Sequence, residues 1–61
     1  MIKKICYTDP ETGEGVCYVR GEGGLTNISE RIEDHYSCWV LSFDDGRELK
    51  VFKPTVIEEQ T

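Results

Sequence analysis

The chain has no long hydrophobic segment. Its apolar runs, such as residues 38–41, are no longer than a strand, whereas a membrane-spanning helix needs about 18 or more apolar residues. Residues 1–4 include two lysines, but the apolar stretch of a secretory signal peptide does not follow them. We therefore expect a protein without membrane contact that resides in the cytoplasm, where thiols are usually reduced.

The chain is also short, with 61 residues and a single histidine, His35. A chain of about 60 residues buries only about 60% of its unfolded surface, so residues 1–61 are expected to form one small domain. That length excludes a multi-domain enzyme and a dinucleotide-binding fold. A catalytic Ser–His or Cys–His pair would have to use His35, and no strained nucleophile turn surrounds a serine or cysteine. The sequence therefore predicts neither an enzyme nor a bound cofactor.

Basic residues are scarce: 7 lysines and arginines stand against 12 aspartates and glutamates, for a net charge of −5. The excess lies in residues 21–45, where Arg31 is the one basic residue. This balance disfavours direct binding to nucleic acid, which depends on neutralising phosphates with lysine and arginine. It favours a partner protein with a basic surface. The acidic residues of this segment are Glu22, Glu30, Glu33, Asp34, Asp44 and Asp45.

Two β-forming segments near the start, residues 2–8 and 16–20, are separated by a turn-forming segment. Pro10 presets the backbone angle of the first corner, and Gly13 tolerates the left-handed conformation that closes the turn. A four-residue loop places Cys6 opposite Cys17 when residues are counted outward. The sequence therefore predicts a hairpin. One of its faces carries Ile5, Tyr7, Val16 and Tyr18.

A second hairpin is predicted from residues 38–43, a turn at residues 44–46, and residues 47–53. A two-residue turn would place charged side chains opposite Leu41 and Phe43. A three-residue loop with Gly46 left-handed in a bulge instead pairs apolar residues with each other. Because a one-residue slip exchanges the two faces, the hydrophobic pattern selects the three-residue loop. The apolar face then carries Trp39, Leu41, Phe43, Leu49 and Val51.

The segment between the hairpins fits two structures. As a helix over about residues 27–36, it has Asn27 as an N-cap, and Ile28, Ile32 and Tyr36 share a face. As a strand, Ile28 and Ile32 alternate with polar residues, and residues 34–37 turn into the second hairpin. A helix of this length depends on packing, whereas the strand gives regularly spaced turns. Both structures remain open at this point.

The end of the chain contains one strand-breaking signal, Pro54, which cannot donate to a sheet ladder. Residues 56–57 are expected to form a last short strand. Residues 58–61 are expected to be a frayed tail.

The order of these elements resembles the small SH3-like barrels. Residues 5–7 would begin the barrel, the loop at residues 10–13 would stand for its first long loop, and residues 53–56 would be the bend before its last strand. Residues 39–43 followed by Asp-Asp-Gly-Arg are also similar to Tudor modules. The resemblance implies a mainly β fold, a partial barrel of two hairpins and a middle strand. The alternative is an α+β fold of order β-β-α-β-β.

Three cysteines and the histidine have the composition of a zinc site, but none of the cysteines has the short spacing of a zinc knuckle. We therefore expect no metal. Cys6 and Cys17 would be close enough for a disulfide, but the odd number of cysteines and a reducing compartment predict free thiols. The four weak metal candidates are Cys6, Cys17, Cys38 and His35.

These observations predict a small acidic binding module that is not an enzyme. One concrete form is an inhibitor that covers the nucleic-acid-binding surface of a basic protein, as small acidic proteins of viruses and mobile elements do. The first alternative is a metal- or thiol-dependent module that uses the three cysteines. The second is a structural subunit that forms homodimers through its strand edges. The predicted partner-binding residues are Glu30, Glu33, Asp34, Tyr36 and Asp44.

Overall fold

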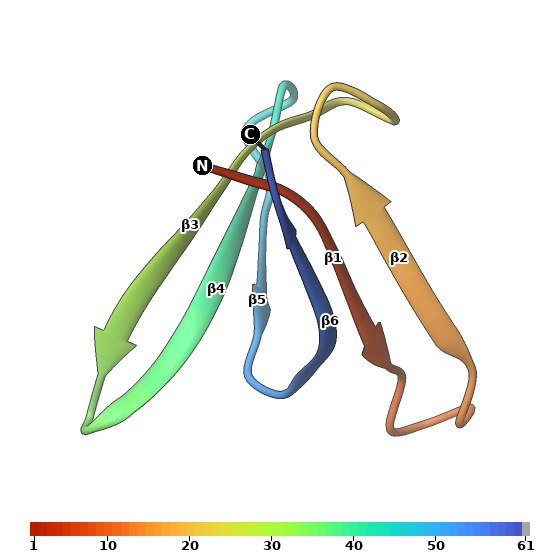
Figure 1. Cartoon of the computed structure of the whole chain (residues 1–61), viewed down its shortest axis with the longest axis vertical. Helices are drawn as coiled ribbons and strands as arrows, with labels where there is room; N and C mark the ends of the chain where they lie inside the picture. Colours follow the sequence, from red (N-terminus) through yellow and green to blue (C-terminus); the bar gives the residue numbers. More distant parts are fainter. Residues whose placement is uncertain (61) are drawn as a thin grey trace.

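Six antiparallel strands form the fold in a computed structural model that describes residues 1–60. They are arranged as two three-stranded sheets, of order β2-β1-β6 and β3-β4-β5 (Figure 1). The prediction of a mainly β fold is confirmed. The ladders do not join into a closed barrel within the described residues. The strands are β1 (Ile2–Thr8), β2 (Gly15–Val19), β3 (Leu25–Glu33), β4 (Tyr36–Phe43), β5 (Glu48–Val51) and β6 (Pro54–Glu59).

The middle segment is a strand, and the helix alternative for residues 27–36 is wrong. β3 pairs with β4 from its first residue to its last, with one register shift near its start. This pairing satisfies its backbone groups and buries Ile28, whereas a helix this short would have needed packing on its own apolar stripe. The turn is shorter than expected: it consists of Asp34 and His35, both with positive φ, so Tyr36 already belongs to β4.

Both predicted hairpin registers are confirmed. Cys6 lies opposite Cys17 in the first hairpin, and Leu41 lies opposite Leu49 in the second. The second turn closes with the Phe43 N–H donating to the carbonyl oxygen of Arg47 at 2.9 Å. Gly46 has φ +90°, the left-handed conformation that the three-residue loop requires.

The core lies between the facing surfaces of the two sheets. Partly buried aromatic rings surround it: Tyr18 stacks on Tyr7 with ring centroids 6.3 Å apart, and it meets the edge of Phe43 at 5.9 Å. Trp39 also packs against the core but is only partly buried. The side chains at its centre are Ile5, Leu25, Ile28, Leu41 and Val51.

The C-terminal strand is longer than expected. Residues 58 and 59, placed in a frayed tail by the sequence pattern, pair with β1 as part of β6. The Gln60 N–H donates to the carbonyl oxygen of Met1 at 2.8 Å, and Lys4 Nζ lies 3.5 Å from Glu58 Oε2. Residue 61 lies outside the described residues. None of the described residues belongs to a helix long and apolar enough to cross a membrane.

A disulfide joins Cys6 and Cys17, and the prediction of free thiols is wrong for this pair. Their Cα atoms are 4.0 Å apart because the hairpin register places them directly opposite each other, on the face away from the core. The odd cysteine count misled the prediction, since the third cysteine, Cys38, is free and fully buried. Disulfides persist mainly in oxidising compartments, so this bond does not support the expected cytoplasmic location, which stays a prediction.

The disulfide should contribute strongly to stability. It closes a loop with a sequence separation of 11, for which the loss of chain entropy in the unfolded state predicts about 3 kcal/mol. A reductant should therefore lower the unfolding free energy of the wild type by that amount in urea titrations. The Cys6→Ala, Cys17→Ala double variant is the control and should not respond to reductant. If the urea midpoint of the wild type does not change when reductant is added, the stabilising role of the disulfide is contradicted.

The backbone strain at the second turn can be isolated with two alanine substitutions. A Cβ at Gly46 or at Gly15 would meet no atom within 4 Å, but only Gly46 has positive φ. Gly46→Ala should cost about 1 kcal/mol through left-handed strain. Gly15→Ala should be neutral or slightly stabilising, because it restricts the unfolded chain without native strain. Equal effects in urea unfolding would mean that the turn does not hold Gly46 left-handed.

Candidate functional site

The tip of the β3–β4 hairpin extends past the core. Ile28 is the last buried residue of β3 and Cys38 the first of β4, and no residue between positions 30 and 37 is buried. The hairpin diverges from the other sheet toward this tip (Figure 1). We call residues 30–37 the arm.

Two apolar side chains dominate the surface of the arm. Ile32 is 74% exposed and Tyr36 is 72% exposed, more than any other large hydrophobic side chain of residues 1–60. Ile32 follows Ile28 and Glu30 on the side of β3 that faces the core, whereas Tyr36 pairs with Glu33 on the opposite face. A partner that covers both side chains must therefore contact both faces of the arm.

The acidic residues of the arm differ in whether they have a basic partner. Glu33 accepts hydrogen bonds from Lys50 Nζ at 2.9 and 3.1 Å, and Arg31 Nη1 lies 3.4 Å from it. The hydrogen bond from Lys50 is the main cause that lowers the pKa of Glu33. Glu30 and Asp34 make no ion pair among residues 1–60. The charge available to a partner therefore lies at Glu30 and Asp34.

The Lys50–Glu33 pair has a structural role on the outer face of its sheet. Lys50 lies on β5 and Glu33 on β3, so their contact spans the central strand β4. Cys38 and Val40, on that face of β4, are 0% and 1% exposed although they point away from the core. The ion pair therefore lies on the same face of the sheet as the buried free thiol.

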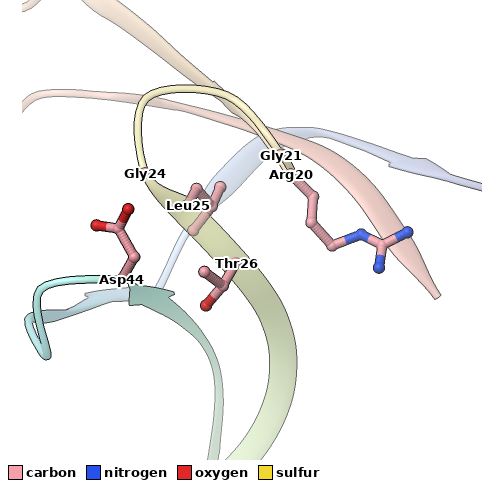
Figure 2. A pocket seen from close by; sticks show the side chains of 6 residues that line it. All are labelled: Arg20, Gly21, Gly24, Leu25, Thr26 and Asp44. Carbon is pink, nitrogen blue, oxygen red and sulfur yellow. The ribbon is translucent and has the colours of Figure 1, made fainter.

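Asp44 lies at the other end of β4 and is not part of the arm. Its N–H donates to the carbonyl oxygen of Gly24 at 2.9 Å, which links the β4–β5 turn to the connection between β2 and β3. It lines an open hollow of about 610 Å³. Figure 2 shows the side chains around this hollow. Arg20 lines the opposite side, but its guanidinium points away and donates to Gln60. The hollow is lined by Arg20, Gly21, Gly24, Leu25, Thr26 and Asp44.

A smaller hollow of about 270 Å³ lies where the end of β1 approaches the β5–β6 connection. Phe52, which is not among the residues predicted for the apolar face of the second hairpin, is 57% exposed at this hollow. Burial raises the pKa of Tyr7, which lies on the wall of this hollow. Residues from both ends of the chain form this hollow, which is why spacing in the sequence did not reveal it.

The four metal candidates do not come together. Cys6 and Cys17 are bonded to each other, Cys38 belongs to the other sheet, and His35 lies in the exposed turn of the arm. No three His, Cys, Asp or Glu side chains in residues 1–60 are placed to hold a metal ion.

The chain matches no protein-family model, no curated protein and no solved structure.

The Glu33–Lys50 pair predicts a specific dependence of stability on pH. A carboxylate whose pKa is lowered on folding stabilises the protein above its ordinary value of 4.5, and this contribution is lost as pH falls through the lower folded value. Glu33→Gln should therefore lower the urea midpoint at neutral pH but not at about pH 2, where the glutamate is protonated in both states. The change is small, since solvent screens exposed pairs.

Glu48→Gln is the matched control. Glu48 lies on the same outer face, on β5, and has no ion pair among the described residues. Its midpoint should follow that of the wild type at both pH values. A Glu33→Gln deficit that persists unchanged in acid would contradict the electrostatic role of the pair.

Proposed function

We propose that this protein is a protein-interaction module that binds its partner through the arm. The observation that carries the proposal is the position of Ile32 and Tyr36, the two most exposed large hydrophobic side chains, on either side of one two-residue turn. A hairpin that served stability alone would gain nothing from these side chains in water. Two such side chains at the tip of one hairpin, one on each face, support a contact surface for a partner that covers both faces of the arm.

The charge of the arm supports a basic partner. Glu30 and Asp34 flank Ile32 and make no ion pair among residues 1–60, and the whole chain carries a net charge of −5. Such a field accelerates the approach of a positively charged surface and is weakened by salt. The proposed partner thus combines lysine or arginine side chains with apolar side chains that contact the arm. Surfaces that bind nucleic acid have that charge, so an inhibitor of a nucleic-acid-binding protein is one form of this function.

The proposed function involves no catalytic step and no metal. Binding rests on the apolar side chains for affinity and on Glu30 and Asp34 for the rate of association. Glu33 and Asp44, which the sequence pattern included among the contact residues, are instead given structural roles, because one is paired with Lys50 and the other is hydrogen-bonded to Gly24.

Selection from a phage-displayed library of random peptides tests the proposal. Peptides that bind the wild type should be enriched in basic and aliphatic residues. The Ile32→Ser, Tyr36→Ser variant should lose about a hundredfold or more of the affinity for them, since each of the two removed apolar contacts contributes about 1.5 kcal/mol or more. The Glu30→Gln, Asp34→Asn variant should bind more slowly at low salt and similarly at high salt.

The matched control removes apolar surface elsewhere. Phe52→Ser, Val56→Ser changes two other exposed hydrophobic side chains, which lie outside the arm. It should bind the selected peptides as the wild type does. The proposal fails if no specific peptide is recovered, if the arm variant binds like the wild type, or if the control loses as much affinity.

A further inference from the structure

β3 is an edge strand over its whole length. Eight of its nine residues pair with β4 on one side, and no strand of the described chain pairs with its other side (Figure 1). An unpaired edge presents a row of backbone donors and acceptors to which another extended chain can be added. β3 also contains no proline that would interrupt such pairing.

The hairpin register defines which backbone groups face this edge. Glu33 and Tyr36 flank a two-residue turn with positive φ at both positions, and in such a hairpin the flanking pair exchanges both hydrogen bonds. Pairs alternate from there, and the register is regular from Asn27 to Glu33. The N–H and C=O groups that point outward therefore belong to Ile28, Glu30 and Ile32.

The side chains of these three residues form an apolar–acidic–apolar row on one face. Ile28 reaches into the core, whereas Ile32 is 74% exposed and Glu30 has no ion-pair partner in residues 1–60. A strand added here would place alternate side chains directly opposite the row, at Cβ distances of about 4.5–5.5 Å. The complementary row is apolar, cationic, apolar.

We propose that the partner binds by adding an extended segment to the free edge of β3, with a lysine or arginine opposite Glu30. This inference rests on the proposed function and deepens it, because it names the backbone groups and the side-chain pattern that recognise the partner. Hydrogen bonds to Ile28, Glu30 and Ile32 supply affinity, and the charge pair selects the register.

The same row disfavours a second copy of the chain as the occupant. When two β3 strands are aligned antiparallel so that Ile28 meets Ile32, Glu30 of one copy lies opposite Glu30 of the other. Like charges directly opposite each other destabilise a sheet. Glu30 therefore favours the addition of a basic segment to this edge and disfavours self-association.

The probe for the test is the peptide acetyl-Thr-Val-Thr-Lys-Thr-Val-Thr-amide, and the control peptide has glutamate in place of lysine. NMR hydrogen exchange on the oxidised protein should show slowing of about tenfold at the amides of Ile28, Glu30 and Ile32 with about 1 mM lysine peptide. The amides of Ser29 and Arg31, which already bond to β4, should change less. Glu30→Lys should reverse the preference and bind the glutamate peptide.

Three outcomes would overturn strand addition: no binding of the lysine peptide at that concentration, binding without slower exchange at the three amides, or an unchanged peptide preference in Glu30→Lys. The phage-selected peptides separate this inference from the proposed function. If they bind through Ile32 and Tyr36 but leave the three amides exchanging freely, the arm binds partners by side-chain contact alone. If no selected peptide depends on the arm, the proposed function itself fails.

Sedimentation of the free protein tests whether a second copy of the chain binds to the edge of β3. Glu30→Gln should self-associate about tenfold more tightly than the wild type, because it removes the opposed charges. A wild type that dimerises with protected amides at Ile28, Glu30 and Ile32 would make a second copy the occupant and overturn the proposal.

Discussion

The contact between the two small sheets is the constraint on which the rest of the structure depends. Each sheet has three strands, and their inner faces share one small cluster around Ile5 and Leu41, both fully buried. A chain of this size is too small to form a second hydrophobic core. The cross-strand disulfide at Cys6 and Cys17 reinforces the hairpin that forms one wall of this cluster, as expected for a scaffold whose apolar burial alone is marginal.

The unequal lengths of the strands create the candidate contact surface. β3 and β4 have nine and eight residues, whereas β5, which shares their sheet, has four. The long hairpin therefore continues past the core, and side chains that would be buried nearer its base, such as Ile32, face solvent at its tip. The Lys50–Glu33 ion pair lies on the outer face of this sheet, where Cys38 is buried and Tyr36 is exposed.

Three properties of the arm support one mode of binding. It offers apolar side chains on both faces, unpaired negative charge at Glu30 and Asp34, and a free backbone edge along β3. The hollow beside Asp44 has no exposed large hydrophobic side chain among its lining residues, and its one basic residue, Arg20, points away from it. Edge strands expose proteins to unwanted pairing, and in the proposed mode of binding Glu30, at the centre of the free edge, attracts a basic strand and repels a second copy of the chain.

The sequence by itself determined the local geometry: the alternation around Leu41 and the Asp-Asp-Gly turn selected one register, and the first turn placed Cys6 opposite Cys17. These features follow from side-chain period and turn chemistry, which act over a few residues. Only the tertiary structure decided that residues 27–36 contain a strand, because pairing with β4 outweighed a local helix signal. It also decided that Glu33 is paired and that Asp44 lies far along β4 from the arm, since both depend on strands brought together by the fold.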